Sequence, residues 1–93
     1  MKVDAERQLV YFAGQVQGVG FRYTARRLAS RYAVSGYVRN LPDGRVEVVV
    51  EGPPSELVSF VDDLRKTMDS YVQHCDIQRA PASGEFDAFE IRF

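Results

Sequence analysis

Residues 14–22 read Gly-Gln-Val-Gln-Gly-Val-Gly-Phe-Arg, a loop with three glycines between an apolar run and a helical pattern. Glycine accepts positive φ and has no Cβ, so neighbouring backbone N–H groups can converge on one point. The first N–H groups of the following helix would lack intrahelical acceptors, and the helix dipole favours negative charge there. Arg22 adds a forked, permanently charged guanidinium. We therefore expect this loop to bind an anion such as phosphate or sulfate.

The segments on either side of the loop predict a strand and a helix. Residues 8–13 are apolar and aromatic, which is typical of a strand buried on both faces or nearly so. After the loop, apolar residues recur at helical spacing as far as Tyr32, and arginines occupy the opposite, solvated side. The apolar set is Phe21, Ala25, Leu28, Ala29 and Tyr32, and the arginines are Arg26, Arg27 and Arg31. We expect Tyr11, Tyr23, Tyr32, Tyr37 and the phenylalanines to be mostly core.

Residues 37–51 predict a tight hairpin. Pro42-Asp43-Gly44 is a strong turn pattern, because proline presets φ and glycine accepts the positive φ that closes the reversal. The strand that follows places Val46, Val48 and Val50 on one face, and its two glutamates, Glu47 and Glu51, on the other.

The remaining residues predict a helix and two strands. Gly52-Pro53-Pro54-Ser55 ends the preceding strand and begins a helix, since proline is tolerated in a first turn. The apolar stripe of this helix is Leu57, Phe60, Val61, Leu64 and Met68. Within residues 71–80 we expect a strand centred on 75–79, and the alternation in 89–93 predicts a half-buried terminal strand. This order, βαββαβ plus a short C-terminal strand, is that of an α+β ferredoxin-like sandwich, with a mostly antiparallel sheet and two helices on one face.

Composition narrows the function classes. The 93 residues suit a single domain over 1–93, with no apolar run long enough to span a bilayer and a polar N-terminus in place of a signal peptide. Cys75 is the only cysteine, which excludes an internal disulfide, and we expect a cytoplasmic protein. The net charge of −1 argues against nucleic-acid binding, yet residues 1–50 carry eight Lys/Arg against four Asp/Glu, a surplus that suits a small anionic ligand.

Asn40 is the second candidate for chemistry. In this element order the end of the second strand can lie beside residues 14–22, because the intervening helix returns the chain. An arginine that holds an anion, together with a neutral carboxamide, suggests hydrolysis in which Asn40 positions water. An acyl phosphate suits such a site, because its leaving group is already a carboxylate, and phosphoryl transfer relies mainly on positioning and charge stabilisation.

The sequence resembles the acylphosphatase family over essentially the whole chain, most specifically from Gly14 to Gly52. The resemblance is carried by residues 14–22, by Gly36-Tyr37-Val38-Arg39-Asn40, and by residues 41–47. It implies hydrolysis of carboxyl–phosphate bonds without metal or other cofactor. It also implies that Asn40 orients the attacking water and that the phosphate helps to take the proton of that water. It further implies that Arg22 binds the phosphoryl group together with backbone N–H groups of the loop, those of Gln15, Val16, Gln17, Gly18, Val19, Gly20 and Phe21.

Two features depart from the family pattern. Many relatives carry a basic residue directly after the first loop glycine, where this chain has Gln15, so we expect weaker long-range attraction of substrate. The segment 69–78 also lacks the Gly-Pro that often precedes the fourth strand in relatives. Neither departure involves Arg22 or Asn40.

Plainer interpretations exist for the same residues. The loop can be an ordinary turn, Arg22 can pair with a surface carboxylate, and Asn40 can belong to the turn before Pro42. The loop lacks the Gly-Lys-Ser/Thr ending of a nucleotide P-loop, and Tyr23 replaces the third glycine of a dinucleotide fingerprint, which argues against ATP and NAD. Adjacent His74 and Cys75 point to opposite faces of a strand, which predicts a surface imidazole and a buried or half-buried thiol.

Two other classes of function stay open for this fold. One is a non-catalytic anion-binding or regulatory module, such as the acylphosphatase-like domains inside larger carbamoyl-transfer proteins. The other is an RNA-recognition domain, although residues 46–49 offer Val-Glu-Val-Val where such a sheet needs aromatic and basic residues. Beyond a small-molecule acyl phosphate we expect no nucleic-acid or membrane partner, and we expect a monomer.

Overall fold

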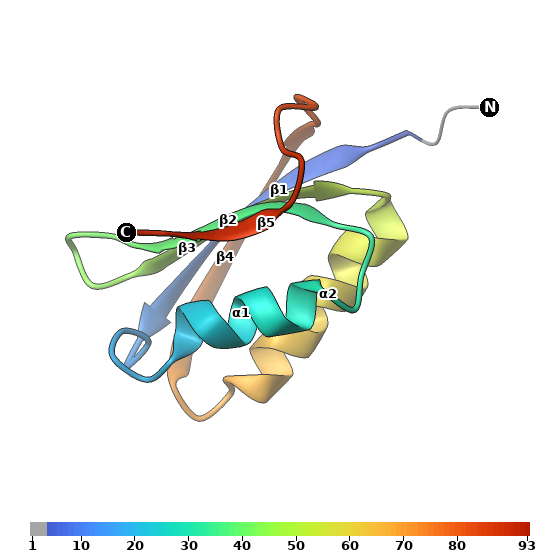
Figure 1. Cartoon of the computed structure of the whole chain (residues 1–93). Helices are drawn as coiled ribbons and strands as arrows, with labels where there is room; N and C mark the ends of the chain where they lie inside the picture. Colours follow the sequence, from blue (N-terminus) through green and yellow to red (C-terminus); the bar gives the residue numbers. More distant parts are fainter. Residues whose placement is uncertain (1–3) are drawn as a thin grey trace.

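The computed structural model describes residues 4–93 and contains two helices and five strands (Figure 1). Their order confirms the predicted βαββαβ arrangement with one added strand. Residues 1–3, which contribute to the expectation of a polar N-terminus without a signal peptide, lie outside the described residues. The elements are β1 (Glu6–Gly14), α1 (Phe21–Ala29), β2 (Ser35–Asn40), β3 (Val46–Gly52), α2 (Pro54–Thr67), β4 (Val72–Pro81) and β5 (Phe89–Arg92).

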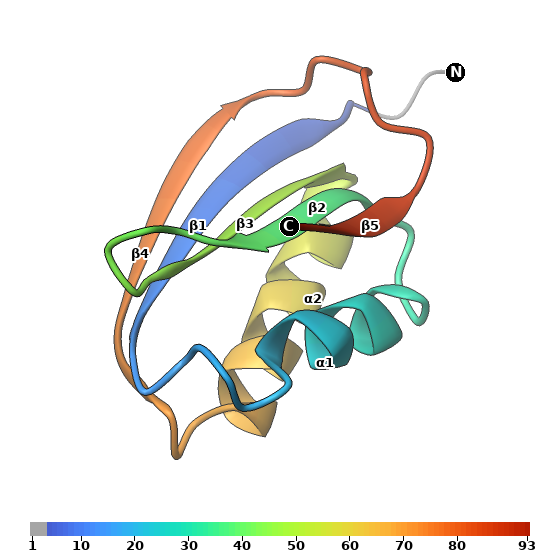
Figure 2. The ribbon, with the colours of Figure 1, turned by 60° about the vertical axis from the view of Figure 1, so that its left-hand side comes forward.

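The strands form one sheet in the order β4-β1-β3-β2-β5. The pairs β1–β3, β1–β4 and β2–β3 are antiparallel, and β5 adds to the outer edge of β2 in parallel. Both helices cover the same face of the sheet, and the two views agree on this (Figures 1 and 2). The predicted ferredoxin-like sandwich, with its mostly antiparallel sheet, is therefore confirmed.

The core lies between the sheet and the two helices. Val10 and Phe12 of β1 are fully buried and face Phe21 of α1, with the Phe12 and Phe21 ring centroids 4.9 Å apart. Side chains at alternate positions of β1 are only half-buried, because no helix covers the other face. The expectation that residues 8–13 are buried on both faces therefore holds for one face only.

The uncovered face of the sheet holds two buried glutamates. Glu47 and Glu51 lie opposite the inward valines, as predicted, but are only 6% and 4% exposed. Glu47 accepts hydrogen bonds from the Arg39 guanidinium at 2.6 Å and the Tyr37 hydroxyl at 3.1 Å. Charged side chains in this position need such partners, since an unpaired buried carboxylate is costly. This face consequently holds paired polar groups beside apolar side chains such as Val49.

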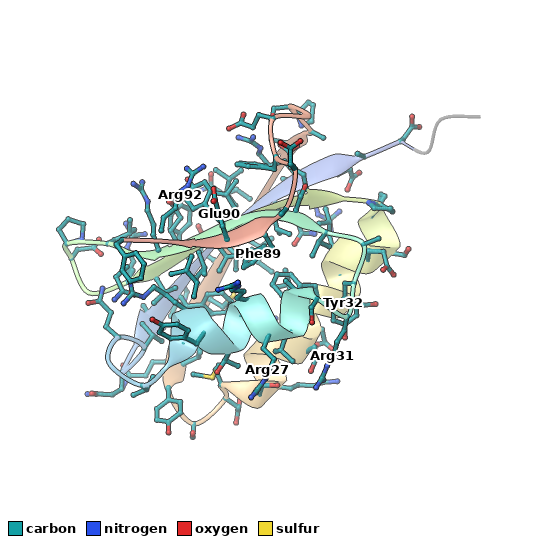
Figure 3. The ribbon with its side chains drawn as sticks, viewed as in Figure 1. Arg27, Arg31, Tyr32, Phe89, Glu90 and Arg92 are labelled. Carbon is teal, nitrogen blue, oxygen red and sulfur yellow. The ribbon has the colours of Figure 1, made fainter. Side chains whose placement is uncertain are left out.

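The remaining sequence predictions are largely confirmed. The predicted turn is closed by a hydrogen bond from the Leu41 N–H to the Arg45 carbonyl at 2.8 Å. In α2, Pro54 stands in the first helical turn, as predicted. The fourth strand is longer than the predicted 75–79. Arg26, Arg27 and Arg31 are exposed, as predicted, and Figure 3 shows Arg27 and Arg31 pointing away from the sheet. No helix among residues 4–93 is long and apolar enough to cross a membrane.

Two core assignments, those of Tyr23 and Phe93, are wrong. The sequence predicts Tyr23 in the core, but its side chain is 62% exposed, because it stands in the first turn of α1 beside the loop, where no other element covers it. Phe93 is 92% exposed. It is the last of the alternating apolar residues from which the terminal strand was predicted.

Candidate active site

A cavity of about 270 Å³ lies where the loop after β1, the start of α1 and the end of β2 meet. It brings together the two residues with the strongest indications of chemistry, Arg22 and Asn40, which stand 18 positions apart in the sequence. Its lining residues are Val16, Gly18, Gly20, Phe21, Arg22, Tyr23 and Asn40. The predicted approach of Asn40 to the glycine loop is thus present.

This meeting follows from the path of the chain. Helix α1 runs away from the loop along the sheet, and β2 returns to end at Asn40 beside the start of the helix (Figures 1 and 2). Asn40 is the last residue of β2 and pairs with Val46 of β3. It therefore belongs to the sheet and not to the turn, which begins at Leu41.

The loop backbone has the conformation that glycine favours. Gly18 and Gly20 have φ of 78° and 77°, in the left-handed region where other residues are disfavoured. The backbone bond that opens α1 runs from the Thr24 N–H to the Gly20 carbonyl at 3.0 Å. The N–H groups of residues 21–23 precede that bond and have no acceptor within the helix, so they remain available to an anion in the cavity.

Three of the predicted substrate-binding residues lie outside the cavity lining. The Gln15 N–H donates to the Tyr71 carbonyl at 2.9 Å, which fixes the start of the loop to the segment before β4. Val19 packs against the hydrophobic core. The Gln17 side-chain amide donates to the carbonyls of Leu41 and Arg45 at 2.8 and 3.0 Å. Gln17 thereby joins the loop to the β2–β3 hairpin, next to Asn40.

Arg22 is oriented by the strand at the edge of the sheet. Its guanidinium carbon lies 4.7 Å from the centroid of the Phe93 ring, and its Nη1 lies 3.5 Å from the Arg92 carbonyl oxygen. A cation above an aromatic face is attracted by the ring quadrupole. Within residues 4–93, none of the ion pairs involves Arg22. The plainer interpretation, that Arg22 pairs with a surface carboxylate, is therefore not supported.

Sequence reasoning missed Tyr23 as a residue of the site. In the sequence, its place directly after Arg22 only argues against a dinucleotide fingerprint and suggests a core aromatic. The position of Tyr23 in the first turn of the predicted helix could have indicated its place in the site, since side chains there lie next to any ligand bound at the helix N-terminus. Tyr23 lines the cavity from α1, opposite the side formed by β2.

His74 and Cys75 lie on β4, away from this cavity. His74 is exposed and Cys75 half-buried, as predicted, and burial raises the pKa of the Cys75 thiol. A raised pKa leaves less of the nucleophilic thiolate at neutral pH. Over residues 4–93 there is no group of three or more His, Cys, Asp or Glu side chains placed to hold a metal ion.

Known proteins match the whole of this arrangement. The family model described as Acylphosphatase matches residues 8–91. An acylphosphatase of Syntrophus aciditrophicus is 44% identical over 95% of this chain and 93% of its own length. One from Paenarthrobacter aurescens is 44% identical over 98% of both chains. The crystal structure of acylphosphatase from Bacillus subtilis superposes with a TM-score of 0.87 at 32% identity, covering 95% of this chain and 99% of that one.

These matches include the loop, Arg22 and Asn40 in one continuous segment, and the superposition covers the elements that bring them together. The chain belongs to the acylphosphatase family.

Proposed function

We propose that this chain hydrolyses acyl phosphates to a carboxylate and inorganic phosphate in the cavity between the loop and Asn40. The observation that carries the proposal is the convergence of Arg22, the free N–H groups at the start of α1, and Asn40 on a single cavity. Family membership supports the hydrolase activity itself and does not favour a non-catalytic module.

In this proposal the phosphoryl group binds to the loop. Arg22 and the backbone N–H groups next to Gly18 and Gly20 donate hydrogen bonds to its oxygens, which stabilises the charge that these oxygens carry in the transition state. The N–H groups are fixed by the loop backbone and Arg22 by its contacts with Phe93 and Arg92 before substrate arrives, so little reorganisation is needed during the reaction. The loop is therefore assigned both binding and rate acceleration.

We assign to Asn40 the positioning of the attacking water. Its carboxamide accepts from or donates to water without exchanging a proton, so its role is to hold the oxygen in line with the bond that breaks. The water oxygen bonds to phosphorus, the bond from phosphorus to the acyl oxygen breaks, and the carboxylate leaves with that electron pair. The water proton passes to a phosphate oxygen. No metal or other cofactor is assigned a role.

The test is hydrolysis of benzoyl phosphate in the presence of a chelator. We expect Arg22→Ala to lower kcat/KM by roughly 10³-fold, and Asn40→Ala by roughly 10²-fold. The matched control is Arg27→Ala, because Arg27 is an exposed arginine on the same helix that points away from the sheet (Figure 3). It should keep the parent rate.

Competitive inhibition by inorganic phosphate separates the two roles. Arg22→Ala should weaken phosphate binding, whereas Asn40→Ala should lower kcat with a much smaller change in the inhibition constant. Full activity in either variant would refute the role assigned to that residue. Loss of turnover on adding chelator would replace the proposed mechanism with a metal-dependent one.

A further inference from the structure

A second cavity opens directly beside the first, between α1 and β5. It measures about 490 Å³, and its large apolar side chains are Tyr23 from the helix with Phe89, Ile91 and Phe93 from the edge of the sheet. Ala88 and the charged side chains of Arg26 and Glu90 complete the lining. Figure 3 shows Phe89 on the helix side of β5, and alternation places Ile91 on that side as well. Phe93 follows the strand and lies against the Arg22 guanidinium of α1. We call this cavity the α1–β5 groove.

The groove adjoins the candidate active site. Tyr23 lines both cavities, and Phe93, which lines the groove, lies under the guanidinium of Arg22. A phosphoryl group bound by Arg22 is therefore only one side chain away from the groove. Whatever is attached to that phosphoryl group has an apolar surface within reach.

The two aromatic residues at this junction are not explained by the core. Tyr23 is 62% exposed and Phe93 is 92% exposed, whereas Phe89 packs edge-on against Phe60 of α2 with ring centroids 5.4 Å apart. Large aromatic side chains left open at the edge of a cavity can bury substantial apolar area when a ligand binds. Tyr23 and Phe93 therefore offer that area next to Arg22.

We propose that the α1–β5 groove binds the acyl group of the substrate, and that Tyr23 and Phe93 make the enzyme selective for acyl phosphates with an aromatic or extended apolar acyl group. The inference rests on the proposed function. It adds the class of substrate, since the loop and Arg22 recognise only the phosphoryl end that all acyl phosphates share.

The experiment compares benzoyl phosphate with acetyl phosphate in the parent, Tyr23→Ser and Phe93→Ser. The measured quantity is the ratio of kcat/KM for the two substrates, which is independent of the folded fraction and cancels general damage to phosphoryl binding. We expect each substitution to lower this ratio about 5- to 20-fold relative to the parent, the scale of losing one apolar contact in a specificity pocket. The control is Val58→Ser, an exposed apolar residue on α2 at 54% exposure, which should leave the ratio unchanged.

The groove assignment would be overturned if the ratio stayed within about twofold of the parent value in both variants, because losing a pocket contact should change it more. That outcome would leave the proposed hydrolase activity unaffected. An equal fall of the ratio in Val58→Ser would overturn it too, because the effect would not be local. If the parent hydrolyses neither substrate, the proposed function fails first and the groove assignment fails with it.

Discussion

The side-chain amide of Gln17 donates a hydrogen bond to the carbonyl oxygen of Leu41 at 2.8 Å. The same nitrogen lies 3.0 Å from the Arg45 carbonyl, so one side chain from the loop binds both ends of the β2–β3 turn. Leu41 directly follows Asn40. The two proposed halves of the site, the loop and Asn40, are thereby fixed to each other by a residue outside the cavity lining.

We expect Gln17→Ala to lower kcat/KM for benzoyl phosphate by roughly 10-fold, because small misplacements of catalytic groups are costly. The free energy of unfolding should fall by only about 1 kcal/mol, the usual net value of side-chain hydrogen bonds. Steady-state kinetics and urea unfolding measure the two quantities.

The control for this prediction is Gln73→Ala, another exposed glutamine, on β4. It should leave both quantities near the parent values. Activity lost from Gln17→Ala in proportion to its stability would mean that Gln17 contributes to folding alone.

Gly36 is the glycine with the least room for a side chain. Its φ is +144°, and a Cβ built there would lie 1.9 Å from the Val49 carbonyl oxygen of the adjacent strand. Because that atom belongs to the backbone of a central strand, it cannot move aside without breaking the β2–β3 ladder. We expect Gly36→Ala to lower the free energy of unfolding by about 3 kcal/mol or more, measured by urea denaturation.

Gly44 provides the matched comparison. It also has a positive φ, +95°, but a Cβ there meets nothing within 4 Å. Gly44→Ala should therefore cost only the conformational strain, about 1 to 2 kcal/mol. Equal losses in the two variants would show that strain, and not the clash with Val49, governs both.

Local patterns were enough to predict the elements of this fold. The spacing of apolar residues in α1 and α2 and the Pro42-Asp43-Gly44 turn each act within one element, and each is present as predicted. The loop was found because glycine and arginine chemistry is visible in sequence, whereas the role of Asn40 rested on the resemblance to the acylphosphatase family. Their meeting follows from the element order. Features that depend on distant partners were not predictable in this way.

The buried glutamates and Tyr23 illustrate that limit. Glu51 is stabilised by Arg7 and by residues 83–84, which are far from it in sequence, so alternation alone suggested an ordinary solvent-facing carboxylate. The place of Tyr23 in the lining of the site depends on a cavity that only the assembled sheet creates. The role of Gln17 likewise depends on the hairpin lying against the loop.

Glu51 links the sheet to the segment that leads into β5. Burial alone raises the pKa of Glu51, but hydrogen bonds from the N–H groups of Ser83 and Gly84, from Arg7, and from the Ser83 hydroxyl outweigh it and lower the pKa to about 2. A lowered pKa in the folded state stabilises the protein above the unfolded value of 4.5, and that contribution is lost as pH falls from there towards about 2.

We therefore expect Glu51→Gln to lower the free energy of unfolding at pH 7 by on the order of 3 kcal/mol, the linkage value of that shift. The difference between parent and variant should shrink as pH falls from about 4.5 to about 2. Urea unfolding across this pH range measures the difference.

The control variant is Asp62→Asn, which removes an exposed ion pair with Lys66 and should lower the free energy of unfolding by no more than about 0.5 kcal/mol. A difference between parent and Glu51→Gln that is independent of pH would contradict the assigned ionisation.

The resemblance to acylphosphatases leads us to expect a basic residue at the position of Gln15. The side chain of Gln15 is exposed, and its N–H is bound to the Tyr71 carbonyl. A lysine there would add positive potential near the cavity without changing the backbone. We expect Gln15→Lys to raise kcat/KM for benzoyl phosphate about 2- to 5-fold at low ionic strength, and the gain to disappear at high salt because screening removes long-range attraction. The control is Gln78→Lys on β4, which adds the same charge away from the cavity and should not raise kcat/KM. A gain that persists at high salt would instead indicate a direct contact between the introduced ammonium group and the substrate.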